Sequence, residues 1–177
     1  ELDGLIDSSL TYARFEREQP ELQLTEVEIA AWLEERIDSS RRLTRTLELQ
    51  LDTSALPAHL RVEVDCRSMP YAITNLLRNA IKYAKTRIRV SAEIADGQFS
   101  LHVDDDGIGI PADERQRIFS AFTRLDRSRD RSTGGYGLGL AIARLVLEQH
   151  GGNASVDDSP LGGARFTLSW PLSQSVT

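Results

Sequence analysis

Apolar residues recur at helical and then at strand spacing along the first third of the chain. Leu2, Ile6, Leu10 and Ala13 fall three or four residues apart, which predicts a helix from position 2 to about 18 that Pro20 ends. A short edge strand over 22–27 and a helix over 29–44 follow. Alternating apolar and polar side chains then predict strands at 47–51 and 60–64. The first helix is too short to be stable alone, so we expect it to pack on the following domain or to belong to a helical bundle.

The remaining pattern alternates helices with paired strands. Ser68 is a suitable N-cap for a helix that reaches about position 84. Strands at 87–94 and 98–103 flank Asp96-Gly97, a strong hairpin signal. A helix start over 111–119, a polar loop over 120–136, a helix over 137–150 and strands at 154–156 and 164–170 complete the chain. We therefore predict an α+β fold, a two-layer α/β sandwich whose mixed sheet has helices on one face, plus an N-terminal helix.

Composition narrows the classes of protein to consider. The chain has 177 residues and a formal net charge of −6, which fits one globular domain with a short appendage and disfavours a nucleic-acid partner. The longest apolar run, 29–33, is far shorter than the roughly 20 residues that span a bilayer. The chain shows no signal peptide and does not begin with Met, so we expect a fragment of a longer protein. Cys66 is the only cysteine, which excludes an internal disulfide and suits a reducing compartment.

Two amide side chains mark the helix predicted after Ser68. Asn75 and Asn79 lie four residues apart and so share one helix face, although Asn is a poor helix former. Asn79 offers Mg²⁺ a neutral oxygen, and Mg²⁺ takes few protein ligands when phosphates are present. Lys82 would reach the same side and contact a phosphate, and Tyr83 is placed to lie against a purine ring. The alternative is a pair of solvated surface amides.

Asp105 follows a predicted strand and precedes two glycines, Gly107 and Gly109. A carboxylate only accepts hydrogen bonds, so at the bottom of a pocket it would accept from the exocyclic amine of adenine and disfavour guanine. The glycines would let the backbone approach a ligand closely. The alternative is an ordinary Asp-Gly turn. The acidic run 104–106 also suggests a metal site, but adjacent strand residues point to opposite faces, so we do not favour one.

A third motif, Gly135, Gly137 and Gly139, precedes an apolar helix. Glycines at the amino end of a helix expose backbone N–H groups where the helix dipole is positive, which suits triphosphate oxygens. No Gly-Lys-Ser/Thr follows, so this is not a Walker A loop, and a loop rather than a strand precedes it, so it is not a Rossmann fingerprint. The locally basic run 124–131 lies between this motif and the preceding one.

In this order and spacing, segments 75–79, 105–110 and 135–140 resemble the N, G1 and G2 boxes of sensor histidine kinases. From about position 22 onward the chain is similar to their catalytic and ATP-binding domain, which has the GHKL, or Bergerat, fold. The resemblance implies an Mg²⁺ ligand in Asn79, phosphate contacts from Lys82 and Arg124 as the catalytic residues, and an adenine reader in Asp105. It implies these further nucleotide-binding residues: Asn75, Tyr83, Gly107, Gly109, Ile110, Phe122, Gly135, Gly137, Leu138, Gly139 and Leu140.

Further segments extend the resemblance. Phe119 and Phe122 match an F box, residues 120–136 would form the lid over ATP, and Gly162-Gly163 with Phe166 resembles a final glycine box. Residues 1–19 resemble the end of the second helix of the dimerisation and phosphotransfer domain, with string 8–14 similar to RstB-type sensors. Residues 20–177 would be the catalytic domain. Asp106, where Asn is usual, and Tyr136, where a small residue is usual, depart from the pattern.

The histidines do not fit the phosphoacceptor sequence of that family. We expect His59 to be a loop residue, His102 a sheet residue and His150 a cation at a helix end. The resemblance therefore implies a chain that binds ATP and Mg²⁺ without phosphorylating itself. Its implied partners are its own dimerisation domain and a response regulator. The parent would be a membrane-anchored homodimer in a bacterial inner membrane with this domain in the cytoplasm. The chain alone would be a monomer or weak dimer.

Two other functions compete with this one. A GHKL-type ATPase, such as relatives of gyrase B or MutL, carries a catalytic Glu four residues before the metal-binding Asn to activate water. That position is Asn75 here, and an amide is not a base, which disfavours hydrolysis. The other alternative is a non-enzymatic nucleotide-binding or docking module.

Overall fold

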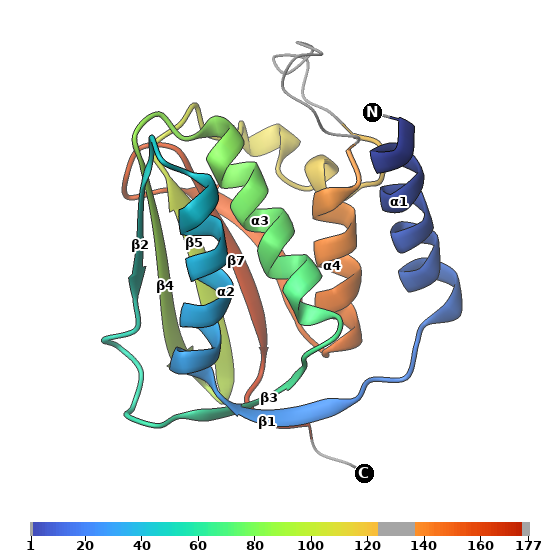
Figure 1. Cartoon of the computed structure of the whole chain (residues 1–177), viewed down its shortest axis with the longest axis vertical. Helices are drawn as coiled ribbons and strands as arrows, with labels where there is room; N and C mark the ends of the chain where they lie inside the picture. Colours follow the sequence, from blue (N-terminus) through green and yellow to red (C-terminus); the bar gives the residue numbers. More distant parts are fainter. Residues whose placement is uncertain (1, 124–136, 175–177) are drawn as a thin grey trace.

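The computed structural model describes residues 2–123 and 137–174 (Figure 1). Its elements follow one another along the chain as α1 Leu2–Ala13, the π-helical η1 Arg14–Glu18, β1 Leu24–Glu28, α2 Ile29–Leu43, β2 Glu48–Asp52, β3 Arg61–Asp65, α3 Met69–Tyr83, β4 Arg87–Ala95, β5 Gln98–Asp105, the 3-10 helices η2 Ala112–Glu114 and η3 Arg117–Phe119, α4 Gly139–Gln149, β6 Asn153–Asp158 and β7 Ala164–Pro171.

The main sheet has five strands in the order β2-β4-β5-β7-β6. β2 runs parallel to β4, and the other pairs are antiparallel, so the sheet is mixed. Helices α2, α3 and α4 cover one of its faces (Figure 1). The predicted α+β sandwich with an N-terminal helix is therefore confirmed.

Strand alternation decides which side chains enter the core. Ile88 and Val90 of β4 point toward the helices and are fully buried, whereas their neighbours Arg87 and Arg89 are exposed on the open face. On the open face of β5 and β7, His102 pairs with Thr167, and the buried Asp104 is bound by Arg165 at 2.8 Å. The helical face of the sheet is thus apolar, and the open face is held by polar pairs across the strands.

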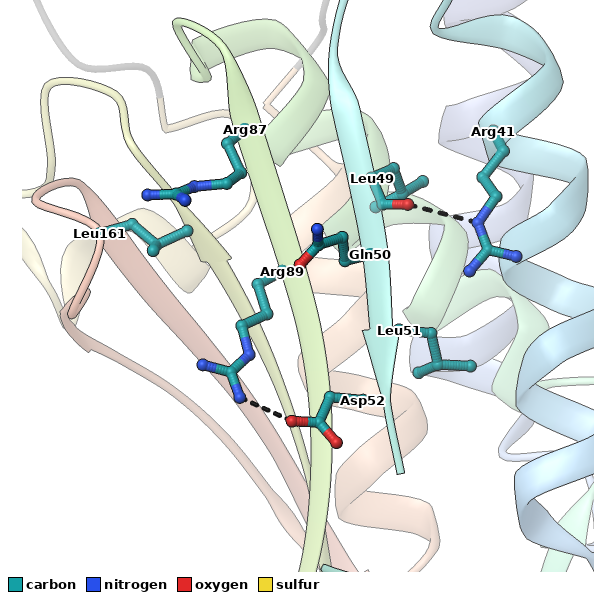
Figure 2. A pocket seen from close by; sticks show the side chains of 8 residues that line it. All are labelled: Arg41, Leu49, Gln50, Leu51, Asp52, Arg87, Arg89 and Leu161. Carbon is teal, nitrogen blue, oxygen red and sulfur yellow. Dashed lines mark hydrogen bonds and ion pairs between the residues drawn. The ribbon is translucent and has the colours of Figure 1, made fainter. Parts of the chain in front are cut away.

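β2 forms one edge of the main sheet, with Arg41 of α2 on one side of it and Arg87 and Arg89 of β4 on the other (Figure 2). Arg41 of α2 donates from Nε to the carbonyl of Leu49 at 3.3 Å, and Arg89 of β4 pairs with Asp52 at 2.6 Å. These residues line a hollow of about 470 Å³. Charged side chains at an edge strand discourage pairing with a strand from another molecule.

The predicted strand at 22–27 is not an edge of the main sheet. It is β1, which pairs antiparallel with β3 in a separate two-stranded sheet, Leu24 opposite Asp65. Just before β1, Phe15 of η1 is buried and packs edge-on against Tyr71 of α3, with ring centroids 5.7 Å apart. The first helix therefore packs on the domain, while its Ile6 remains half exposed.

Two local predictions differ from the structure. Ser68 immediately precedes α3, but its side chain makes no capping hydrogen bond and its buried Oγ has no partner. Segment 111–119 is not one α-helix but two 3-10 turns, η2 and η3, in which Ser120 N–H bonds back to Arg117 and ends the second turn. Short 3-10 pieces commonly serve as such connectors.

Candidate functional site

Helix α3 presents the predicted amides away from the sheet. Leu76, Leu77 and Ala80 are buried on its inner face, whereas Asn75 and Asn79 are only partly buried. The predicted shared helix face is therefore observed. Near the end of α3, the ammonium of Lys82 lies 5.1 Å from the centre of the Tyr83 ring, which is a cation–π distance. Both side chains are partly buried on the same part of the molecule as the amides.

Asp105 ends β5 as a buried carboxylate with 2% of its surface exposed. Its Oδ1 accepts hydrogen bonds from the backbone N–H groups of Gly107 at 2.9 Å and Ala164 at 3.2 Å. Burial raises the pKa of Asp105 above its ordinary range, even though both backbone donors act in the opposite direction. Within the described part of the chain both bonds use Oδ1, and Oδ2 accepts none.

Glycines make this arrangement around Asp105 possible. A β-carbon on Gly163 would lie 2.1 Å from Oδ1 of Asp105, and the N–H of Gly163 donates to the Asp105 carbonyl at 3.1 Å. A β-carbon on Gly107 would lie 2.3 Å from the carbonyl oxygen of Tyr83. Because real β-carbons do not approach so closely, only glycine fits at these two positions. The structure thus brings Tyr83, Asp105 and the last glycine pair together.

Asp106 ties the same segment to the turn after α3. Its carboxylate accepts from the backbone N–H groups of Lys85 at 2.8 Å, Thr86 at 3.1 Å and Arg87 at 3.2 Å, and from the Thr86 hydroxyl. Hydrogen bonding, foremost from Thr86, holds the pKa of Asp106 well below its ordinary range. The departure from the family pattern at this position therefore has a structural use, because an ionised carboxylate can accept from more donors than an amide oxygen.

The third motif lies beside the first. A β-carbon on Gly139, at the start of α4, would lie 3.2 Å from Oδ1 of Asn75. Gly137 has a φ of +72° and its carbonyl accepts from the N–H of Phe122 at 2.8 Å. The ring of Phe122 is 63% exposed, whereas Leu138 is buried. Gly137, Gly139 and the half-buried Leu140 thus place the amino end of α4 next to Asn75.

The predicted F box divides between core and surface. Phe119 is buried and meets Phe166 edge-on, with ring centroids 6.2 Å apart, and only Phe122 is exposed. Three other predicted positions, Arg124, Gly135 and Tyr136, lie outside the described residues. Their assignments stay predictions.

A pocket of about 480 Å³ adjoins the second motif. Ile108, Gly109 and Ile110 line it together with Gly163, and Arg115 at its wall pairs with Asp158 at 2.7 Å. A volume of this order suits a small molecule. Its lining, within the described residues, does not include Asn79 or Asp105, so we do not assign it to a nucleotide.

The residues present fit a magnesium ion held mainly by phosphates. Among the described residues no group of three or more His, Cys, Asp or Glu side chains could hold a metal ion alone. Asn79 nevertheless offers a partly buried amide oxygen on the face of α3 that adjoins α4. This ligand type suits Mg²⁺ when phosphate oxygens and water complete the coordination.

The histidines have structural environments. His59 lies in a loop and His102 in β5, as predicted. His150 lies at the end of α4, as predicted, but the prediction that it is a cation is wrong, because the residue is fully buried. Its Nδ1 donates to the Val146 carbonyl at 2.8 Å and its Nε2 accepts from the N–H of Asp65 at 3.1 Å. Burial lowers the pKa of His150, so the ring is neutral in the fold.

Sequence patterns did not reveal two contributors to the site. Ala164 donates its N–H to Asp105 from a strand 59 residues away, and Thr86 binds Asp106. Neither residue type carries a signal in the sequence, since Ala164 acts through its backbone and Thr86 through a tertiary contact.

Within residues 2–123 and 137–174, no helix has the length and apolar character that a membrane span requires.

Comparison with known proteins places the chain in a family. The sequence model of the family described as histidine kinase-, DNA gyrase B-, and HSP90-like ATPase matches residues 64–174. The sensor protein RstB of Escherichia coli K12 is 41% identical over 172 residues, which are 97% of this chain and 39% of RstB. The sensor histidine kinase CpxA of the same strain is 32% identical over 171 residues, 97% of this chain and 37% of CpxA. The chain thus spans about two fifths of the length of these curated relatives.

A solved structure agrees with the sequence comparison. The crystal structure of full-length ShkA in complex with AMPPNP matches with a TM-score of 0.82 and 28% identity, over 99% of this chain and 37% of that one. The fold and the matched family agree with each other. The chain belongs to the family of histidine kinase-, DNA gyrase B- and HSP90-like ATPases.

Proposed function

We propose that this chain is the ATP-binding catalytic domain of a two-component sensor histidine kinase. It would donate the γ-phosphoryl group of ATP to a histidine on a dimerisation domain. The relatives named as sensor proteins and the AMPPNP in the ShkA structure support this assignment. The observation that carries it is Asn75, an amide that adjoins Gly139 at the amino end of α4, where a hydrolase would need a carboxylate base.

Adenine recognition falls to Asp105. Its Oδ1 is occupied by the backbone donors of Gly107 and Ala164, which fixes the carboxylate and leaves Oδ2 to accept from the exocyclic amine of the base. Guanine presents a carbonyl there and would meet the carboxylate with repulsion. Tyr83, whose carbonyl adjoins Gly107, would lie against the purine, and Ile110 and Phe122 would flank it.

Residues of α3, the amino end of α4 and residues shortly before α4 would bind the phosphates. Asn79 would bind Mg²⁺, which neutralises and orients the phosphates when it is present. The N–H groups from Gly137 to Leu140 would bind phosphate oxygens at the positive end of α4. Lys82 would leave the Tyr83 ring for a phosphate, which frees that ring face for the purine. Arg124, outside the described residues, would offset the charge of the transferred group, and Gly135 would border it.

The domain boundaries and partners are also proposals. Residues 1–19 would be the end of the second helix of a dimerisation and phosphotransfer domain, and residues 20–177 the catalytic domain. The parent would be a membrane-anchored homodimer that passes the phosphoryl group to a response regulator, with this domain in the bacterial cytoplasm. The chain alone would be a monomer or a weak dimer.

Calorimetry tests the site. We expect Mg²⁺–AMPPNP to bind the wild-type chain and to lose at least about tenfold in affinity, or about 1.4 kcal/mol, in Asn79→Ala and in Asp105→Ala. Asn153→Ala, an exposed asparagine at the start of β6, is the matched control and should bind as the wild type does. Unchanged affinity in both site variants would contradict the assignment.

A further inference from the structure

A polar cluster with two buried members joins the segment after α1 to the base of α4. We define the base cluster as Asp65, Arg67, His150 and Gln174. Asp65, the last residue of β3, is 2% exposed, and His150, which directly follows α4, is fully buried. The proposed nucleotide site lies at the other end of the same helix, at Gly137 and Gly139. The base cluster takes no part in the site described above, so its polar groups need another explanation.

The Asp65 side chain holds the segment that leads from α1 into β1. Its Oδ2 accepts from the backbone N–H of Gln23 at 2.9 Å. Its Oδ1 accepts from the backbone N–H of Arg67 at 2.8 Å, and the Arg67 guanidinium bonds both to Asp65 at 3.2 Å and to the Glu21 carbonyl at 3.2 Å. The side chains of Asp65 and Arg67, which lie in one turn, therefore bind both ends of segment 21–23.

His150 joins this turn to α4. The backbone N–H of Asp65 donates to Nε2 of His150 at 3.1 Å, and Nδ1 of His150 donates to the Val146 carbonyl within α4 at 2.8 Å. Gln174 donates to the His150 carbonyl at 2.6 Å. The pattern needs a neutral ring with its proton on Nδ1, which agrees with the lowered pKa of His150. A continuous chain of hydrogen bonds thus runs from Gln23 through Asp65 to α4.

Helix α4 is short and well packed, so its two ends move together. Its 11 residues span about 16 Å at 1.5 Å per residue, and its own Val146 and Leu147 are fully buried. Helix α1 and η1 also contact α4 directly (Figure 1). The chain that enters the domain after α1 is therefore attached to the helix that carries the third glycine motif, both along its side and at its base.

We propose that Asp65 is a positioning residue that couples the order of segment 21–23 to nucleotide binding at the opposite end of α4. This inference rests on the proposed function, since it needs a nucleotide at Gly137 and Gly139. Coupling of binding free energies is reciprocal. If an attached segment raises the nucleotide affinity by some factor, bound nucleotide must hold the segment in place by the same factor. A cluster that only stabilises the fold would not show this link.

Hydrogen exchange measures the coupling. Exchange at the amides of Glu21, Leu22 and Gln23 would be followed by NMR, with and without saturating Mg²⁺–AMPPNP. We expect nucleotide to slow exchange at Gln23 at least about threefold in the wild-type chain, within the range of typical couplings. In Asp65→Asn one acceptor oxygen is lost, so we expect no slowing and at least about threefold weaker nucleotide binding.

Asp52→Asn is the matched control. Asp52 is also a carboxylate that binds an arginine, as Figure 2 shows, and a backbone N–H. It lies at the β2 edge, whereas segment 21–23 precedes β1 on the other side of the molecule (Figure 1). Its variant should keep both the slowing and the affinity of the wild type. If Asp65→Asn does not fold, Arg67→Gln gives the same readout, because it removes the bond to the Glu21 carbonyl from a half-exposed position.

The possible results separate this inference from the proposed function. Nucleotide that binds the wild type but leaves exchange at residues 21–23 unchanged overturns the coupling and leaves the proposed function standing. A folded Asp65→Asn variant with wild-type affinity and wild-type slowing overturns it as well. A wild-type chain that binds no nucleotide in the calorimeter contradicts the proposed function, and the coupling is then wrong with it.

Discussion

Gly163 makes room for the carboxylate of Asp105: a β-carbon at position 163 would lie 2.1 Å from Oδ1 of Asp105 and 2.5 Å from the N–H nitrogen of Gly107. The contact joins the loop before β7 to the end of β5. The backbone N–H groups of Gly107 and Ala164 both donate to Oδ1 of Asp105 beside Gly163, and these two bonds hold the carboxylate in one orientation. The proposed recognition of adenine therefore depends on a glycine that would touch no nucleotide.

The variant Gly163→Ala tests this dependence. Its methyl group must displace the Asp105 side chain or separate β7 from β5, so we expect nucleotide affinity to fall at least about tenfold, or about 1.4 kcal/mol. The free energy of unfolding should also fall, by about 1–3 kcal/mol, because the methyl group overpacks a closed site. Calorimetry and urea unfolding measure the two effects.

A second glycine separates binding from stability. Gly97 in the β4–β5 hairpin has a φ of +75°, but nothing lies within 4 Å of a β-carbon placed there. Gly97→Ala should lose about 1 kcal/mol of stability from backbone strain and keep its nucleotide affinity. If Gly163→Ala binds nucleotide as tightly as Gly97→Ala does, the close approach to Asp105 has no role in recognition.

Asp105→Asn should abolish the preference for adenine. The amide keeps the size and one acceptor oxygen for Gly107 and Ala164, but it turns an NH₂ group toward the exocyclic amine of the base. We expect the ratio of ATP to GTP affinity to fall at least about tenfold, to near unity. Competition of both nucleotides for one site would measure the ratio, and an unchanged ratio would exclude Asp105 as the base reader.

The same variant has a predictable pH dependence of stability. Burial raises the pKa of Asp105 in the folded chain above the ordinary value of 3.8, so the fold binds this proton more tightly than the unfolded chain does. The free energy of unfolding of the wild type should therefore fall relative to Asp105→Asn as pH rises from 3.8 through the raised pKa. Urea unfolding across this range checks the sign, and a wild type that becomes more stable relative to Asp105→Asn as pH rises would contradict it.

Asp106→Ala should loosen the turn that follows Lys82 and Tyr83 at the end of α3. The change leaves the N–H groups of Lys85, Thr86 and Arg87 without their common acceptor. Because this site is accessible to water, we expect a stability loss of only about 1 kcal/mol and a nucleotide affinity several-fold weaker. Asp106→Asn, which restores the usual family residue, should recover most of the affinity. Equal affinity in Ala, Asn and wild type would show that the turn does not position the site.

His150→Gln should make the chain less sensitive to mild acid. The buried ring has a pKa below the ordinary value of 6.5, so the unfolded chain binds this proton first. The stability that neutral His150 contributes is complete above 6.5 and is lost as pH falls below it toward the folded pKa. The wild type should lose up to about 1.4 kcal/mol per pH unit in this window through this one group, and the Gln variant should not.

An exposed histidine gives the control for this experiment. His59→Gln changes an imidazole with 84% of its side chain exposed, and it should keep the acid response of the wild type. If the His150 and His59 variants lose stability equally on acidification, a buried neutral ring at His150 is excluded.

The sequence predicted the structure correctly where the spacing of apolar residues determines a whole helix or strand. Asn75 and Asn79 share a face because Leu76, Leu77 and Ala80 turn the opposite face of α3 into the core. The hairpin around Asp96-Gly97 is equally local, since both residues adopt positive φ in the turn. Asp105 ends the alternating strand β5 beside glycines, which agrees with the predicted position at the bottom of a pocket.

Prediction failed where a distant partner decides the environment. His150 follows a helix, which suggests an exposed cation, but the N–H of Asp65 from 85 residues away needs a buried acceptor there. The strand at β1 gave no sign that it pairs with β3 outside the main sheet. Ser68 has the right residue type for a cap, yet burial next to Met69 leaves its hydroxyl without a partner.

We propose that the chain transfers the γ-phosphoryl group of ATP to a histidine and does not hydrolyse ATP. Phosphotransfer is measured with γ-labelled ATP and Mg²⁺, supplied to the chain together with a separate dimerisation domain that bears an acceptor histidine. We expect acid-labile, base-stable label on that domain, none when its histidine is replaced by Gln, and none on the chain alone. Rapid release of inorganic phosphate with an unlabelled acceptor would show instead that the chain is an ATPase.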